Sequence, residues 1–356
     1  MAGSTFGRLL RLTTFGESHG AGLGGILDGC PPGLELAEED LQRDLDLRRP
    51  GQSPASTSRK EPDRVRLLSG VFQGRTTGTP IAFFVANEDQ RSRDYAEVAT
   101  KFRPGHADWS YVQKYRGVYD YRGGGRASGR ETVARVAGGA IARKLLALRG
   151  VDLHAGAVEL GGIAASREEM DLAGAFDRPY YAAAPGVVPL WDERVAEAKS
   201  AGDSLGGIVE VVATGVPAGL GEPVFDKLEA LLAHGVMSVG AVKGVEVGDG
   251  FAASRATGSR NNDPLLPGGF DSNHAGGTLG GISSGQDVVV RAAVKPIASI
   301  AIPQRTLTRD GEPATIVVGG RHDVSAIPRI VPVIRAMVAL VLADAMLIQA
   351  RMSVLP

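Results

Sequence analysis

The sequence predicts an α+β arrangement of layers rather than a doubly wound parallel sheet. Segments with strand-like character outnumber what a simple alternation of strand and helix would give. Residues 20–25 fit the pattern G-x-G-x-x-G, but Gly-Glu-Ser-His precedes them and Pro31-Pro32 follows closely. Because the dinucleotide fingerprint needs a strand before its glycines and a helix opening at them, this match does not predict a Rossmann fold.

The helices follow from apolar spacing. Residues 36–49 carry leucines at helical spacing, with acids early and arginines late, and a Pro-Gly pair ends the segment. Residues 131–149 form the clearest amphipathic pattern and end at a glycine. Two more helices are expected at residues 225–238 and 328–352.

The strands follow from β-branched and aromatic runs between turn residues. Glycines at residues 74–78 indicate a turn between the first two of them. Strands are expected at residues 65–72, 80–86, 208–214, 241–247, 287–294 and 314–318.

Composition limits the class of protein. The 356 residues hold one cysteine, Cys30, which excludes an internal disulfide and fits the reducing cytoplasm. The apolar run at residues 336–348 is too short to span a membrane and contains Asp344, so we expect a buried helix and no membrane contact.

Charge is distributed unevenly along the chain. Residues 1–150 carry 23 Lys and Arg against 17 Asp and Glu, whereas residues 151–356 carry 16 against 23. Most of the basic residues are arginine, whose planar fork suits carboxylates and phosphates. Aromatic residues are only 5% of the chain, so platforms for stacking nucleic-acid bases are scarce. A small, highly anionic ligand is therefore favoured over nucleic acid.

Three glycine-rich segments carry histidine or arginine. Residues 13–33 include seven glycines around His19, which indicates turns or a site built partly from backbone N–H groups. Residues 120–131 place three glycines between arginines just before a helix, a pattern typical of anion binding. Residues 271–285 form the third segment and contain His274.

The remaining histidines have simpler contexts. His106 follows Pro104-Gly105 in a loop that favours a presented side chain. His154 and His234 lie in ordinary strand and helix contexts and are expected to be structural. His274 and His322 are either ligand contacts or loop groups satisfied by protein. The histidine spacing matches no metal-binding pattern, so we expect no metal site.

Taken together, these blocks resemble the chorismate synthase family. The likeness runs from residue 3 to about residue 350 and is weakest between residues 150 and 200. The matching blocks are residues 14–20, 28–33, 103–108, 120–126, 272–285 and 320–323.

The resemblance implies a β-α-β sandwich with mixed antiparallel sheets and helices, formed by residues 1–356 as a single domain, and a homotetramer. It implies conversion of 5-enolpyruvylshikimate 3-phosphate to chorismate by 1,4-elimination of phosphate, with reduced FMN required but no net redox change. NADPH is expected as an indirect reductant, through a separate flavin reductase.

The resemblance also assigns residues. It places His19 by the leaving phosphate, has His106 protonate the reduced flavin, lets Ser18 relay a proton, and has Asp323 aid removal of the ring proton through the flavin. Ser128 is included among the catalytic residues. The flavin contacts carried over are Arg126, Ala127, Ser128, Gly240, Ala241, Gly280, Lys295, Pro296, Ile297, Ala298, Ser299 and Arg321.

The chemistry of the ligands independently favours cations. The substrate carries two carboxylates and a phosphate, and FMN adds a second phosphate. A histidine that titrates near neutral pH can bind such a group charged and give up a proton as phosphate leaves. Arginines expected at the substrate or NADP site are Arg48, Arg49, Arg59, Arg122 and Arg130.

This chain departs from the family pattern at several positions. Ala127 and Gly129 stand in a stretch that is commonly Arg-Ser-Ser-Ala-Arg, and Gly240 stands where asparagine is usual. Pro54 replaces a common arginine, and Arg335 stands where glutamate is common. A further departure is the run Val-Ser-Ala-Ile-Pro-Arg that follows Asp323.

Two other functions are compatible with these residues. An ordinary flavin oxidoreductase would transfer a hydride and oxidise one flavin per product. A phosphate- or RNA-binding module would bind no flavin and would show a steep dependence of nucleic-acid affinity on salt.

Overall fold

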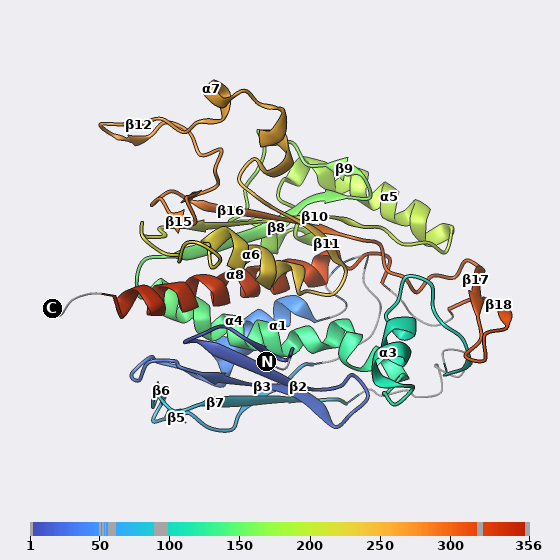
Figure 1. Ribbon diagram of the computed structural model, residues 1–356. Helices are drawn as coiled ribbons and strands as arrows, with labels where there is room; N and C mark the ends of the chain where they lie inside the picture. The colour runs from blue at the N-terminus through green and yellow to red at the C-terminus, as the bar shows by residue number, and fades with distance from the viewer. Residues whose placement is uncertain are drawn as a thin grey trace.

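The computed structural model describes residues 3–49, 51, 53, 55, 62–88, 99–318 and 323–352. Two five-stranded antiparallel sheets enclose a layer of helices (Figure 1). The expected α+β class and the β-α-β sandwich are both confirmed. The predictions made at Pro54, Arg59, Arg321 and His322 lie outside the described residues.

The lower sheet in Figure 1 has the strand order β1-β2-β3-β7-β4. Its bounds are β1 Thr5–Phe6, β2 Arg11–Gly16, β3 Gly22–Asp28, β4 Val65–Leu67 and β7 Ile81–Ala86. Short strands β5 (Val71–Phe72) and β6 (Arg75–Thr76) form a hairpin beside it. The strand expected at residues 65–72 is thus divided into β4 and β5.

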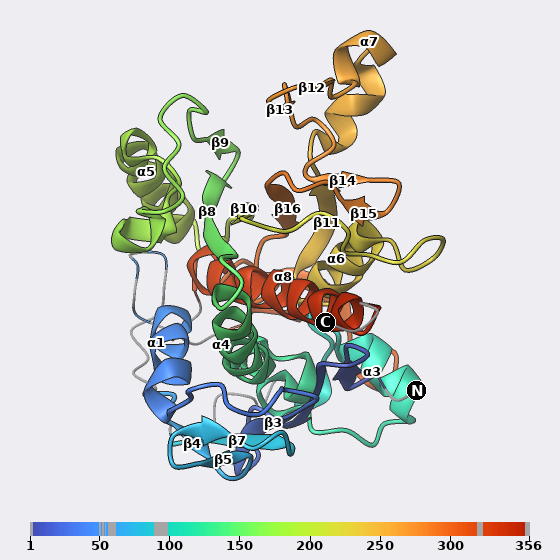
Figure 2. The ribbon, with the colours of Figure 1, turned by 90° about the vertical axis from the view of Figure 1, so that its left-hand side faces the viewer.

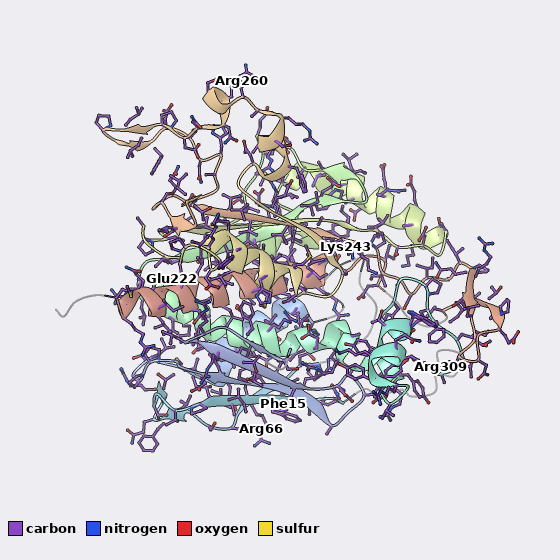
Figure 3. The ribbon with its side chains drawn as sticks, in the orientation of Figure 1. Phe15, Arg66, Glu222, Lys243, Arg260 and Arg309 are labelled. Carbon is purple, nitrogen blue, oxygen red and sulfur yellow. The ribbon has the colours of Figure 1, made fainter. Side chains whose placement is uncertain are left out.

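The glycine-rich segment around His19 is largely sheet, which differs from the turn-rich prediction. Glycines of β3 lie against aromatic rings: a Cβ on Gly24 would lie 2.5 Å from the ring of Phe15, and one on Gly25 would lie 2.6 Å from the ring of Phe83. Since any larger residue would displace a ring, these glycines serve packing. Figure 3 shows Phe15 on the outer side of the lower sheet.

The upper sheet has the order β11-β16-β10-β8-β9. Every pair in it is antiparallel, and bulges interrupt the register at Ile208/Val209 and at Val242/Gly244. The bounds are β8 Asp152–Leu160, β9 Ile163–Ala164, β10 Gly207–Thr214, β11 Val242–Val247 and β16 Val288–Val294.

The helical layer contains α1 (Glu38–Arg48), α4 (Thr132–Ala147), α6 (Leu228–Met237) and α8 (Ile327–Ala350). All four were predicted, with ends that differ by up to three residues. α4 and α8 cross between the sheets in both views (Figure 2). Among the described helices, α8 is apolar and long enough to cross a membrane, but 89% of its apolar window is buried, so it is a core helix.

Smaller elements surround this sandwich. Helix α5 (Val188–Ser200) covers one edge, and α7 (Gly258–Asn261) with the hairpin β12 (Leu265–Leu266) and β13 (Gly269–Phe270) projects from the upper sheet (Figure 2). Helix α3 (Asp108–Tyr115) and the hairpin β17 (Gln304–Leu307) and β18 (Pro313–Ile316) lie at the right-hand end in Figure 1. The hairpin β14 (Thr278–Leu279) and β15 (Ile282–Ser283) lies at the opposite end.

Candidate active site

Two of the predicted histidines lie against adjacent glycines. The stretch Arg122–Ala127 contains Gly123, Gly124 and Gly125, all with φ between 53° and 82°. A Cβ on Gly123 would lie 2.3 Å from Nδ1 of His19, and a Cβ on Gly124 would lie 3.1 Å from Cε1 of His106. The left-handed backbone and these approaches both require glycine. The triple glycine therefore brings the segments that carry His19 and His106 together.

The turn between β2 and β3 presents Ser18 and His19. Oγ of Ser18 lies 3.2 Å from Nδ1 of His19 and donates to the carbonyl of Arg122 at 3.3 Å. Because that hydroxyl proton is used at Arg122, Nδ1 of His19 carries the proton in the Ser18–His19 bond. In the neutral ring this assignment places the lone pair on Nε2.

The side chain of Asn87 holds the same turn through hydrogen bonds. Its Nδ2 group donates to the carbonyls of Glu17 at 2.9 Å and of Gly20 at 2.8 Å, which are the two ends of the turn. Its Oδ1 accepts from Nε of Arg130. Sequence analysis missed Asn87, because its partners are more than 40 residues away along the chain.

A buried carboxylate orients His106. Nδ1 of His106 lies 2.8 Å from Oδ1 of Asp108, and Arg103 donates to the same carboxylate through Nε and Nη2, each at 2.8 Å. Nη2 of Arg103 also lies 3.0 Å from Nδ1 of His106, but the carboxylate is closer and only accepts, so the proton of this hydrogen bond lies on Nδ1. Nε2 is then the atom turned toward Gly124, where a Cβ would lie 3.2 Å from it.

Asp108 stays charged despite being 1% exposed. Burial by itself would raise the pKa of Asp108, but hydrogen bonds from Arg103 and His106 and their charges lower it well below the ordinary value. Both Arg103 and Asp108 belong to a sequence block in which we had singled out only His106. Their spacing to His106, within a Pro-Gly loop, is the signal that could have identified them.

Arginines border the glycine loop. Arg126 donates through Nη1 to the carbonyl of Gly16 at 3.1 Å and through Nη2 to Oγ1 of Thr14 at 2.7 Å, so it ties the loop to β2. Arg122 pairs with Asp120 at 2.8 Å and keeps 44% of its side chain exposed. The hydrogen bond from Arg122 is the main reason that the pKa of Asp120 is lowered.

The segment 295–299 forms a second wall. Nζ of Lys295 donates to the carbonyl of Gly105 at 2.5 Å, and a Cβ on Gly105 would lie 3.5 Å from Cβ of Ala298. The backbone N–H of Lys295 donates to the carbonyl of Ala241 at 2.9 Å, and Ala241 has a φ of 72°. The expected residues 295–299 thus meet the loop that carries His106, and Ala241 adjoins them through Lys295.

Asp323 is linked to that wall through other residues. Its Oδ2 accepts from Nη1 of Arg329 at 3.0 Å. Two residues after Asp323, Ser325 forms an isolated β-bridge with Leu205. The residue before Leu205, Ser204, donates through its hydroxyl to the carbonyl of Ile297 at 2.7 Å. The altered residues after Asp323 therefore supply its ion-pair partner, Arg329.

Two of the expected ligand contacts are buried arginines. Arg48 is 1% exposed and Arg130 is 8% exposed, and both bind Asp63, at 3.1 and 2.8 Å. Arg48 also donates to the carbonyl of Gly129 at 3.2 Å. Asp63 thus holds both guanidinium groups next to the residues that follow the glycine loop, and their contact with a ligand stays a prediction.

Other expected residues lie apart. Gly280 adjoins the start of α6, where N–H of Leu228 donates to the carbonyl of Gly281, whereas Gly240 follows the end of α6. Ten helical residues separate the two by about 15 Å. Arg49 is half-exposed and lies 3.4 Å from Asp46, and Ser128 accepts from N–H of Arg130 at 3.3 Å as a helix cap.

The other described histidines have partners within the protein. Nε2 of His154, which was expected to be structural like His234, lies 3.6 Å from Asp152. His234 packs against the ring of Phe6 at 5.5 Å. His274 lies 2.8 Å from Oδ1 of Asp263, so it is a satisfied loop group. Burial raises the pKa of Cys30 to about 11, which keeps this thiol protonated and unreactive.

The fold and this cluster define a sandwich enzyme whose glycine loop, histidines and arginines suit a phosphorylated ligand. A family model described as Chorismate synthase matches residues 10–347. The chain belongs to the chorismate synthase family.

Individual relatives agree with the family model. A chorismate synthase of Desulfovibrio desulfuricans is 69% identical, and one of Nitratidesulfovibrio vulgaris is 65% identical, each alignment covering 99% of both chains. A solved structure titled "Crystal Structure of Chorismate Synthase" aligns with a TM-score of 0.77 at 35% identity, over 96% of this chain and 93% of that one.

Proposed function

We propose that the chain converts 5-enolpyruvylshikimate 3-phosphate to chorismate by eliminating phosphate, with reduced FMN required and no net redox change. The observation that carries this proposal is the placement of His19 and His106 against adjacent glycines. One proton donor for a leaving phosphate and a second, separately oriented proton carrier are what this elimination needs.

The residues present fit a flavin phosphate and ring. The three glycines let the backbone of the loop lie directly against His19 and His106. Arg126 ties this loop to β2, and Lys295 lies at Gly105 in the loop that carries His106, so both histidine segments have a cation suited to a phosphate. We assign FMN contacts to this loop, to residues 240–241 and to residues 295–299. Reduced FMN, when bound, supplies electron density that is recovered at the end of the reaction.

The chain's own residues handle the protons. His19, with Nδ1 held by Ser18, gives a proton from Nε2 to the leaving phosphate, a step typically worth about 10²–10⁴ in rate. His106, with Nδ1 fixed by Asp108, holds its transferable proton at Nε2 beside Gly124. Asp323 aids removal of the ring proton.

Charge binds the substrate before any bond breaks. Arg122 keeps a half-exposed fork at the mouth of the loop and is our candidate for a substrate carboxylate or phosphate. The buried pair Arg48 and Arg130 raises the positive charge behind the loop.

We further propose a cytoplasmic homotetramer that receives flavin reduced by a separate reductase, with NADPH as the indirect source of electrons. The position of Gly280 supports the assembly, because it lies at the far end of α6 from Gly240. A flavin bound at one copy of the chain can take one of these two contacts from a neighbouring copy. Light scattering on the purified protein would test the tetramer.

The decisive test supplies substrate with chemically reduced FMN under anaerobic conditions. Many phosphates released per flavin, with the flavin still reduced, would support elimination. One flavin oxidised per product would replace it with the oxidoreductase alternative. Absence of flavin binding, with a steep salt dependence of RNA binding, would favour the binding-module alternative.

A further inference from the structure

A cavity lies between α1, α4, α8 and the start of β8. It has a volume of about 460 Å³ and is bordered by Lys144 and Ala147 near the end of α4. The glycine loop precedes the other end of that helix, and twelve residues of helix between Thr132 and Lys144 span about 18 Å. The cavity is therefore separate from the candidate active site.

The cavity holds more cationic than anionic groups. Asp40 and Asp44 lie one helical turn apart on α1. Asp40 is contacted by Arg43 and by Nζ of Lys144 at 2.5 Å, and Asp44 by Arg143 at 2.8 Å and by Arg335 at 3.1 Å. Four cations thus share two carboxylates.

A rim carboxylate does little to balance this excess. Asp152 is 63% exposed and lies 3.6 Å from Nε2 of His154. Exposed charges of this kind are strongly screened by water and salt. Arg43 is 74% exposed and is screened in the same way, so the excess positive charge inside the cavity comes from Arg143, Lys144 and Arg335 against Asp40 and Asp44.

Arg335 is the least satisfied of these groups. It is 5% exposed, its Nη2 reaches Asp44, and its Nε has no hydrogen-bond partner. Its guanidinium lies over the ring of Phe176 at 4.3 Å. Burial lowers the pKa of Arg335 to about 10; Asp44 opposes that shift and the neighbouring charge of Arg143 adds to it. A buried guanidinium whose charge is incompletely paired is stabilised by a further anion beside it.

Donors and apolar surface are both available to a ligand. Arg143 contacts both oxygens of Asp44 through Nη1 alone, at 2.8 and 3.0 Å, which leaves its Nε and Nη2 for another acceptor. Lys144 is 32% exposed and uses one hydrogen bond. Buried Val151 and Leu153 line the same cavity and can accept hydrocarbon.

We propose that this cavity binds a small organic dicarboxylate. One carboxylate contacts Arg143 and Arg335, the other contacts Lys144 and Arg43, and the short hydrocarbon spacer lies on Val151 and Leu153. The carboxylates that these cation pairs already contact, Asp40 and Asp44, lie one turn of α1 or about 5.4 Å apart, a spacing that two carboxylates on a short hydrocarbon spacer can match.

Calorimetric titration with glutarate at constant ionic strength tests this proposal on the purified full-length chain. We expect saturable binding in the unaltered protein. Arg143→Gln and Lys144→Gln should each weaken it at least about tenfold, since each removes a charged hydrogen-bond donor. Lys144 is partly exposed, so its variant should fold even if Arg143→Gln does not.

Arg122→Gln is the matched control, because it removes an arginine at the glycine loop instead. It should bind glutarate as the unaltered chain does. Loss of binding in Arg122→Gln with retention in Lys144→Gln would place the probe at the glycine loop and overturn the proposal. Failure to bind glutarate at up to about 20 mM, far above a useful dissociation constant, would also overturn it.

Discussion

Nδ1 of His106 lies 2.8 Å from Oδ1 of Asp108, and Arg103 holds the other side of the same buried carboxylate. This arrangement fixes which nitrogen of His106 is protonated and turns its Nε2 toward Gly124. A carboxylate–histidine pair of this kind orients a proton carrier without itself contacting the ligand.

Loss of the orienting carboxylate should therefore slow turnover less than loss of the histidine. We expect His106→Ala to lower kcat by about 10- to 1000-fold, as the loss of one proton carrier does, and Asp108→Asn to lower it by about 10-fold. Steady-state kinetics with reduced FMN would measure both. Unchanged kcat in His106→Ala would refute the role assigned to this histidine.

Gly123→Ala should disable the site through His19. Its Cβ would lie 2.3 Å from Nδ1 of His19, and the residue's φ of 57° adds strain for any L side chain. We expect kcat to fall at least about 100-fold, because a displaced acid no longer reaches the leaving group. Gly129→Ala is the control, since nothing lies within 4 Å of its Cβ. Equal losses in both variants would contradict this account.

Asn87→Ala should release the turn that presents His19. It removes two hydrogen bonds to carbonyls, which together contribute about 2 kcal/mol to stability. We expect lower kcat and a changed pH profile, with a modest drop in Tm. Gln42→Ala, which removes similar bonds beside α1, should lower Tm without changing the pH profile. Identical pH profiles in both variants would show that Asn87 is only structural.

The lowered pKa of Asp108 predicts how the stability of the chain changes with pH. A carboxyl group whose pKa is lower in the folded chain contributes stability above its ordinary value of 3.8, and this contribution is lost as pH falls toward the folded value. Asp108→Asn should thus destabilise the chain at pH 7, and the difference from the unaltered chain should shrink below about pH 4. Urea unfolding at both pH values would measure it; a constant difference would contradict it.

Local patterns predicted the elements well and the glycine segment poorly. The spacing of apolar residues was enough to predict α4 and α8, because each helix buries at least one continuous apolar face in the core. The segment around His19 forms strands, since Gly24 and Gly25 make room for rings that come from other strands. Phe15 belongs to the segment itself, but Phe83 comes from β7, so that part of the reason cannot be read from the segment.

In the candidate site, too, some features could be predicted from the sequence and others depend on packing. His19 and His106 were identifiable by composition, because each follows or precedes glycine in a polar loop. Arg48 and Arg130 were expected at the ligand, but their burial against Asp63, 15 and 67 residues away, could not be foreseen from the sequence. Arginine patterns locate positive charge, but only packing decides which guanidinium groups remain exposed.

The most direct measurement of the central claim is a crystal structure of the chain with FMN and 5-enolpyruvylshikimate 3-phosphate. The account predicts density for both ligands at the loop of Gly123 and Gly124, with the phosphate of the substrate at His19 and the flavin at His106. Density for the ligands away from these two histidines, in every copy of the chain, would contradict it.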